Sequence, residues 1–208
     1  MAAKSLDLVV STVVEGPTDA AIVTRIVQLA GLQVGTIYPQ GGKHHLDRRL
    51  AGYNNAAKFG PWLVVRDLNG DAPCAPALVD RILPAPGRFM ILRIAVRAAE
   101  AWLLADREGI ARFLAIASER IAVSPEDLVD PKRELVNLAR GSRRRSIRDD
   151  MVPQEGTTGR VGPGYPGRIM EFARDSWRPE VAAQQSPSLA RCIAALARWT
   201  ADDTSHAR

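Results

Sequence analysis

The sequence has 208 residues, of which 46% are apolar and 25% are charged, and these proportions exclude a largely disordered chain. The formal net charge of +5 is compatible with a polyanionic partner, although many basic proteins never bind nucleic acid. The N-terminal segment lacks the apolar stretch of a signal peptide, and no segment approaches the ~20 apolar residues of a membrane span, so we expect a cytoplasmic protein without membrane contacts.

Strands and helices are predicted to alternate through the first half of the chain. Apolar, β-branched runs predict four strands, in "LDLVVSTVVEG", "QVGTIYPQ", "PWLVVRDL" and Met90 to Val96. A helical pattern follows each strand, and the pattern after Val96 predicts one long helix. This order favours an α/β fold with a mainly parallel four-stranded sheet flanked by helices.

The character of the sequence changes near residue 123. Beyond it the chain has helical patterns but no convincing strand, and a Gly/Pro-rich loop is expected at residues 153 to 167. We therefore predict a domain over residues 1–122 and a helical, Arg- and Gly/Pro-rich appendage over residues 123–208, packed on that domain.

Acidic side chains follow three of the four predicted strands. Ligands of open parallel sheets bind outside the carboxyl ends of the strands, so these side chains are predicted to share one edge. The candidates are Glu15 and Asp19 after the first strand, Asp67, Asn69 and Asp71 after the third, and Glu100 and Asp106 after the fourth.

Such a cluster is costly unless a cation neutralises it, because like charges ~4 Å apart repel by several kcal/mol. Mg²⁺ suits this role, since it prefers oxygen ligands from one or two carboxylates, water and phosphate. Each residue alone also has a simpler interpretation. Asp67 to Gly70 fits a turn, Asp19 fits a helix N-terminus, and Glu100 fits a solvated helix face. Only their joint placement indicates a metal site.

Three segments, "VVEGPTDAAIVTRIV", "WLVVRDLNGD" and "AVRAAEAWLLAD", resemble the Toprim fold over residues 6 to about 110. More narrowly, they are similar to the Toprim domain of OLD-family nucleases and to a related stand-alone family of uncharacterised proteins. Glu15 matches the Toprim Glu after the first strand, and Asp67 matches the first Asp of the DxD motif. Asp19, Glu100 and Asp106 match further acids of OLD-type domains.

The chain departs from the DxD motif at its second acid, which is Asn69. An asparagine offers a neutral oxygen in place of a carboxylate, and Asp71, two positions beyond, is the candidate that compensates. The resemblance implies Mg²⁺- or Mn²⁺-dependent hydrolysis of DNA or RNA, with Glu15 as metal ligand or general base. For the cation that stabilises the transition state, Lys132 in "DPKREL" is the first candidate and Lys43 the second.

OLD-type Toprim domains are usually coupled to an ATPase. A role in defence against phage would fit the resemblance to this family. This chain has no GxxxxGK[ST] loop, so any ATPase is expected to be a separate subunit. The sequence also leaves open whether the chain forms a homodimer.

Two clusters of basic residues are candidates for nucleic-acid binding. "ARGSRRRSIR" contains Arg143, Arg144 and Arg145, and "QGGKHHLDRR" contains Lys43 and Arg48. Guanidinium groups suit phosphate recognition, although a solvated helix end balanced by Asp149 and Asp150 explains the first cluster as well.

Two alternatives to a nuclease remain at this point. The neutral Asn69 favours a catalytically weakened Toprim-type module that binds nucleic acid or a partner without cutting. An enzyme that acts on a nucleotide is indicated instead if the acidic pocket lacks a neighbouring basic track.

Overall fold

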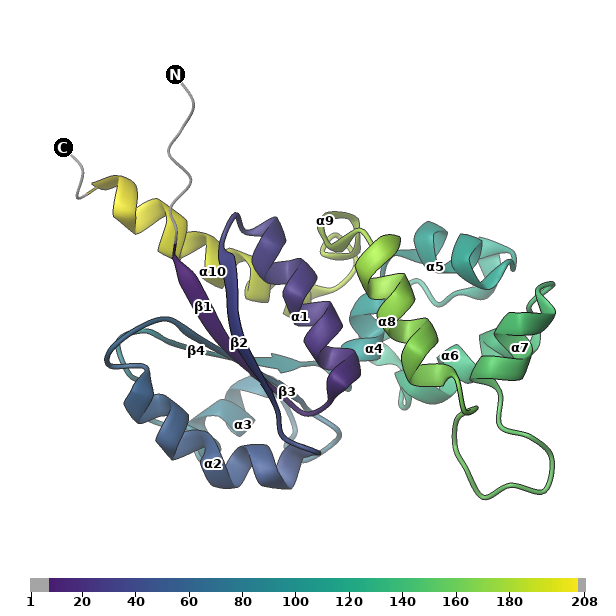
Figure 1. Cartoon of the computed structure of the whole chain (residues 1–208), viewed down its shortest axis with the longest axis horizontal. Coiled ribbons are helices and arrows are strands. Elements are labelled where there is room, and N and C mark those ends of the chain that lie inside the picture. Colours follow the sequence, from purple (N-terminus) through teal and green to yellow (C-terminus); the bar gives the residue numbers. More distant parts are fainter. Residues whose placement is uncertain (1–7, 206–208) are drawn as a thin grey trace.

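The structure, a computed structural model, describes the backbone of residues 8–205 and side chains as far as residue 200 (Figure 1). The first half of the chain alternates strands and helices: β1 (Val9–Val14), α1 (Pro17–Leu29), β2 (Gln33–Pro39), α2 (Lys43–Ala56), β3 (Trp62–Asp67), α3 (Ala75–Ile82) and β4 (Met90–Ala95). The remainder is helical: α4 (Ala99–Leu104), α5 (Arg107–Leu114), α6 (Pro131–Arg140), α7 (Arg145–Met151), α8 (Tyr165–Asp175), α9 (Pro179–Ala182) and α10 (Pro187–Ser205), with 3-10 turns at Ser118–Arg120 and Pro125–Asp127.

The four strands form one parallel sheet in the order β2-β1-β3-β4, which confirms the predicted fold class. This arrangement is compatible with Toprim-like folds. The two central strands pair on both sides: Leu63 of β3 lies opposite Thr12 of β1 and Ile91 of β4. Their burial on both faces accounts for the apolar runs that predicted them, since helices cover a parallel sheet on each side.

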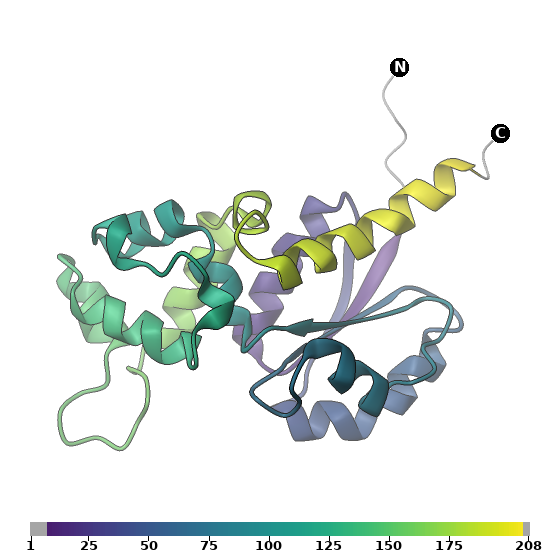
Figure 2. The ribbon, with the colours of Figure 1, turned by 180° about the vertical axis from the view of Figure 1, so that it is seen from behind.

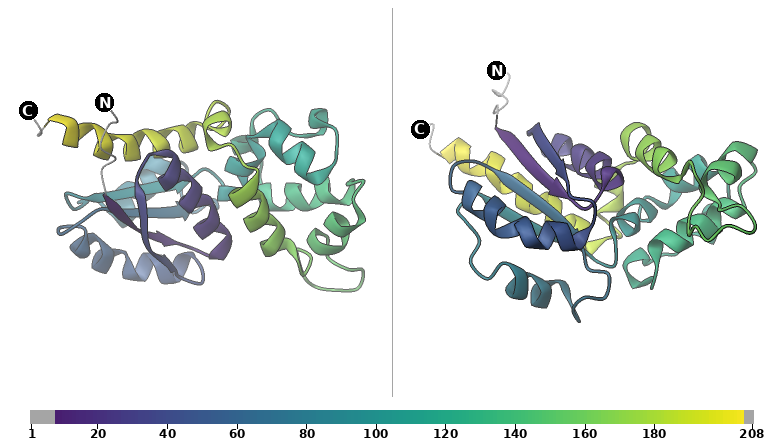
Figure 3. Two further views of the ribbon diagram at one scale, coloured as in Figure 1. Left: turned by 45° about the horizontal axis from the view of Figure 1, so that its top comes forward. Right: turned by 60° about the horizontal axis from the view of Figure 1, so that its bottom comes forward.

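Helices cover the two faces of the sheet in separate groups (Figures 2 and 3). Leu46 and Leu50 of α2 and Leu78 of α3 share a core with Val64 on one face. The other face packs against α1 and α10. The parallel strands therefore all deliver their carboxyl ends to one edge, between these layers.

The C-terminal helices share the larger core with the sheet. Helix α8 packs along α1, and α10 packs on β4. Two buried tryptophans join the segments: Trp102 donates to the Ser188 hydroxyl at 2.7 Å, and Trp177 donates to the Trp102 carbonyl at 3.3 Å. These contacts hold the helical region at the carboxyl edge of the sheet.

The long helix expected after β4 is divided in two. Helix α4 ends at Leu104, and Asp106 begins α5 by accepting a hydrogen bond from the Gly109 N–H at 3.0 Å. A side-chain cap of this kind replaces the missing intrahelical partner of a first-turn N–H. The apolar pattern continues through the break because both helices are buried on the same core.

No helix within residues 8–205 combines the length and the apolar character that crossing a membrane requires.

Candidate active site

The carboxyl ends of β1, β3 and β4 open into a cavity of about 680 Å³. Four of the carboxylates that line it follow strands: Glu15 and Asp19 after β1, Asp67 at the end of β3, and Glu100 in the first turn of α4. Asp130, before α6, is the fifth. Asn69 lines it as well. The structure thus brings Glu15 and Glu100, which lie far apart in the sequence, to one cavity.

Backbone hydrogen bonds orient three of these carboxylates. The Asp67 N–H donates to Glu15 Oε1 at 2.9 Å, and the Ala99 N–H donates to Asp67 Oδ1 at 2.9 Å. These two bonds connect the ends of β1, β3 and β4. Asp19 caps α1 by accepting from the Gly16 N–H at 2.8 Å.

The electrostatics of the cluster disfavour its full ionisation. Burial, and then the charges of Asp19, Glu100 and Glu15, raise the pKa of Asp67 well above its ordinary value. Burial and Glu100 raise the pKa of Asp19 to about 7. Burial also raises the pKa of Glu15, against the opposing effect of the Asp67 N–H and Arg66. A cation placed among these carboxylates would favour their charged forms and lower their pKa values.

The raised pKa of Asp19 predicts a stability that falls with rising pH. The native state binds a proton that the unfolded chain, with a pKa near 3.8, has released, so stability is lost between about pH 4 and pH 7. Asp19→Asn is expected to remove this loss and to raise the free energy of unfolding at pH 8 by up to about 4 kcal/mol. Urea unfolding in EDTA measures it. An equal pH dependence in Asp19→Asn and wild type contradicts the assignment, and the exposed-site variant Asp175→Asn is the control.

A lysine and a tyrosine from the helical region form one wall of the cavity. Lys132, at the start of α6, places Nζ 3.8 Å from Glu100 Oε1 and 5.4 Å from the centre of the Tyr165 ring. The Tyr165 hydroxyl donates to the same Glu100 oxygen at 3.4 Å. Burial and the Glu100 charge raise the pKa of Tyr165, so this hydroxyl keeps its proton and its role as a donor. Of the two lysines predicted as the cation, Lys132 is the one that lines the cavity, beside Glu100.

The backbone beside the carboxylates adopts left-handed conformations. Asn69 has φ +46°, Gly70 has φ +75° and Arg97 has φ +63°. The Asn69 N–H donates to the Arg97 carbonyl at 2.9 Å, so the loops after β3 and β4 hold each other in place. Asparagine tolerates this region, whereas for arginine it is sparsely populated and costs about 1–3 kcal/mol. Strain of this kind is concentrated at functional sites, and both residues line the cavity.

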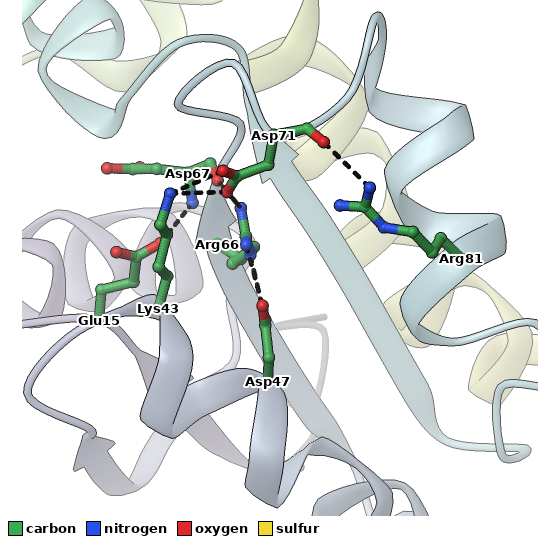
Figure 4. A network of polar contacts seen from close by, with 7 residues as sticks. All are labelled: Glu15, Lys43, Asp47, Arg66, Asp67, Asp71 and Arg81. Atoms are coloured by element: carbon green, nitrogen blue, oxygen red, sulfur yellow. Dashed lines mark hydrogen bonds and ion pairs between the residues drawn. The ribbon is translucent and has the colours of Figure 1, made fainter.

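Asp71 lies outside the lining of the cavity and is bound by two cations (Figure 4). Lys43 Nζ lies 2.7 and 2.9 Å from its two carboxylate oxygens, and Arg66 Nη1 lies 2.7 Å from Oδ2. Although burial opposes it, the hydrogen bonds from Lys43 and Arg66 lower the pKa of Asp71. Arg66 itself is buried and also pairs with Asp47 at 2.9 Å. Asp71 and Lys43 therefore neutralise one another here.

Asp106 also lies away from the cavity. Its carboxylate is fully buried and accepts hydrogen bonds from the Gly109 N–H, from the Arg178 N–H at 3.0 Å and from Arg178 Nε at 3.1 Å. This side chain joins α5 to the segment before α9. Asp106 therefore stabilises the packing of these helices and is not part of the cavity lining.

The basic residues predicted to bind nucleic acid do not line the acidic cavity. Arg48 is exposed on α2, and Arg143 and Arg144 are exposed in the turn before α7. Arg145, at the start of α7, forms an ion pair with Asp149 at 3.3 Å. All four side chains are open to solvent.

Further residues of the cavity were not among the predicted site residues: Arg97, Asp130, Arg160 and Tyr165. Arg160, which is ion-paired with Asp130, comes from the Gly/Pro-rich loop, and an arginine flanking such a loop was the available signal. Tyr165 carries no signal in the sequence, because a tyrosine after a glycine loop is also typical of a core residue.

The possible metal ligands among the side chains that line the cavity fit a hard divalent cation, since they are all oxygen atoms of carboxylate, amide or hydroxyl groups. Among the described side chains, no group of three or more His, Cys, Asp and Glu residues lies close enough to hold a metal ion. The Glu100 charge nevertheless contributes to the raised pKa values of Asp19 and Asp67, so the three carboxylates lie within electrostatic reach of one another. Coordination of one ion would therefore require the side chains to rotate inward.

Comparison of the chain with models of protein families, with curated proteins and with solved structures finds no match in any of the three.

Proposed function

We propose that the chain is a divalent-metal-dependent phosphodiesterase that cleaves nucleic acid, similar to the Toprim domains of OLD-family nucleases. One observation carries the proposal: four carboxylates from three strand ends line one cavity, with Lys132 on its wall. The segments that resemble Toprim motifs supply three of the strand ends and all four acids. Asp67 and Glu15 match the two central motif positions of that family.

The residues of the cavity divide into three roles in this proposal. Glu15, Asp67 and, from the neighbouring turns, Asp19 and Glu100 would hold Mg²⁺ or Mn²⁺, which when bound orients a phosphate and lowers the pKa of a water molecule. Lys132 donates to the negative charge that develops on the phosphate. Glu15 is alternatively the general base, because its raised pKa brings it closer to neutral pH.

Incubation of the purified protein with plasmid, single-stranded DNA and RNA tests the proposal. Cleavage is expected with Mg²⁺ or Mn²⁺ and not with EDTA. Thermal unfolding gives a second readout, because an ion that binds only the native state raises the melting temperature. Absence of both cleavage and stabilisation in either metal contradicts the proposal.

The structure also gives an observation that favours a second candidate, a module that binds nucleic acid without cutting it. Asn69 contributes no charge, and Asp71 is held by Lys43 and Arg66. Neither residue therefore restores the second carboxylate of the DxD motif. Binding of nucleic acid that persists without cleavage in both metals supports this candidate.

An ATPase partner and a role in phage defence are proposals that rest on the family resemblance alone. Residues 1–208 contain no phosphate-binding GxxxxGK[ST] loop, so these residues would not themselves supply an ATPase activity. Size-exclusion chromatography of the chain with a co-expressed ATPase tests this association. The same measurement on the chain alone shows whether it forms a homodimer.

A further inference from the structure

Three hollows lie in a continuous row from the acidic cavity along α6 to α7. The acidic cavity shares Lys132, Arg160 and Val161 with a second hollow of about 470 Å³. The second hollow shares Arg140 and Pro153 with a third of about 690 Å³. We call the second and third hollows together the α6–α7 groove.

The α6–α7 groove is strongly basic. Asp149 is the acidic residue among those that line the groove, and it is paired with Arg145. Arg160 is paired with Asp130. Within the described part of the chain, Arg133 and Arg140 take part in no ion pair. The cations that line the groove are Lys132, Arg133, Arg140, Arg145, Arg148 and Arg160. Lys132 is paired with Glu100 as well, so three of the six cations have an acidic partner, while Arg133, Arg140 and Arg148 have none among the described residues. These three charges favour a polyanion in the groove.

The geometry of α6 produces this row of charges. Arg133, Asn137 and Arg140 lie at i, i+4 and i+7, which places them on one face of the helix. The opposite face, with Leu135 and Leu138, is buried in the core. The basic stripe is therefore about 10 Å long from Arg133 to Arg140, at a rise of 1.5 Å per residue.

The loop between α7 and α8 supplies the second wall of the groove. Gly159, Arg160 and Val161 line it opposite α6. Backbone bonds close the base of this loop: the Gly162 N–H donates to the Met151 carbonyl and the Gly164 N–H to the Asp150 carbonyl, both at 2.9 Å. Figure 1 shows the loop projecting beyond these two helices.

We propose that the α6–α7 groove holds the sugar-phosphate backbone of one nucleic-acid strand whose scissile phosphodiester lies in the acidic cavity. This inference rests on the proposed function and adds to it the surface that holds the substrate and the single-stranded form of that substrate. A groove walled on two sides suits one strand rather than a duplex. No described residue that lines it is aromatic, so it offers phosphate contacts without base stacking, and little sequence preference follows.

Fluorescence anisotropy in EDTA tests the groove without cleavage. The probe is a fluorescein-labelled oligodeoxythymidylate about twenty nucleotides long, a length that exceeds one binding site. Arg133→Gln/Arg140→Gln is expected to weaken binding about 10-fold and to lower the slope of log K against log salt by about 1.4, because each phosphate contact on a single strand contributes about 0.7.

The matched control is Arg191→Gln/Arg198→Gln on α10. It removes the same charge from two exposed arginines that are also seven residues apart on a helix. Less than about 2-fold weakening is expected there, because these residues do not line the groove. Arg133→Lys/Arg140→Lys, which keeps the charges, is expected to retain most of the binding and excludes loss of folding as the cause.

Three results would overturn the inference. They are equal weakening by the α6 and α10 variants, no binding of the single strand by wild type, and tighter binding of a duplex of the same length. Because all are measured in EDTA, failure of the groove is distinguishable from failure of the proposed function, which the metal-dependent cleavage assay tests separately.

Discussion

Asp67→Asn is expected to lower metal-dependent cleavage of nucleic acid by at least about 10³-fold. Asp67 lies at the end of the central strand β3, and its carboxylate faces the cavity among three other acids. The asparagine still accepts the Ala99 N–H through Oδ1, so the fold is retained while the charge is lost. Initial rates on single-stranded DNA with Mn²⁺, compared with wild type, measure the effect. Glu15→Gln is expected to act in the same direction.

The stability of Asp67→Asn gives an independent check on this prediction. Because burial and neighbouring acids raise the pKa of Asp67, its charged form destabilises the native state at neutral pH. Without metal, the variant is therefore expected to be at least as stable as wild type, and Mn²⁺ is expected to stabilise it less. A variant that is inactive because it is unfolded contradicts this interpretation.

Asp71→Asn tests whether Asp71 replaces the carboxylate that the DxD motif lacks at Asn69. Asp71 is bound by Lys43 and Arg66 and lies outside the cavity lining, so its loss is expected to reduce cleavage less than about 10-fold. A loss as large as that of Asp67→Asn would show that Asp71 replaces the missing carboxylate of Asn69. Asp175→Asn, at an exposed site, is expected to leave the rate unchanged.

Arg178→Ala is expected to lower the free energy of unfolding by about 3 kcal/mol. Its guanidinium binds the carboxylate of Asp106, which has 0% exposure, and its loss leaves a buried charge with only backbone donors. A buried carboxylate without its cation carries most of its desolvation cost uncompensated. Urea unfolding followed by tryptophan fluorescence at neutral pH measures the change.

Arg174→Ala is the matched control for Arg178→Ala. Arg174 pairs with Asp175 on the exposed end of α8, and surface ion pairs contribute little to stability. No measurable change is expected. Equal destabilisation by both variants would contradict a specific role of the Asp106–Arg178 pair. Mn²⁺ affinity that falls in Asp106→Asn under conditions where it is folded would instead return Asp106 to the metal site.

Much of the α/β architecture follows from local pattern. The β-branched runs of β1, β3 and β4 predict strands because buried parallel strands are apolar on both faces. Glu15 and Asp67 stand directly after such runs, so the rule that strand ends share an edge predicts their proximity. Asp19 follows from its position in the first turn of α1, four residues after Glu15.

The same reasoning was insufficient for residues that lie a few positions beyond a strand. Asp71 is two residues past Asn69, yet the left-handed backbone at Asn69 and Gly70 directs the chain toward Lys43 and Arg66. Asp106 continues the helical pattern of Glu100, but a helix break after Leu104 turns it toward Arg178. The sequence signals a turn at Asn69 and Gly70 but not the direction in which the chain leaves it, and the break after Leu104 has no distinctive signal.

The sequence by itself determined the parallel sheet, the edge at which its strands end and the acids delivered there, because these depend on short-range periodicity and on chain direction. Only the tertiary structure decided which acids face the cavity, that Lys132 and Tyr165 complete its wall, and that the arginines of α6 and α7 form one groove. Those features depend on how distant helices pack on the shared core, and packing is set by the fit of whole surfaces rather than by any local pattern.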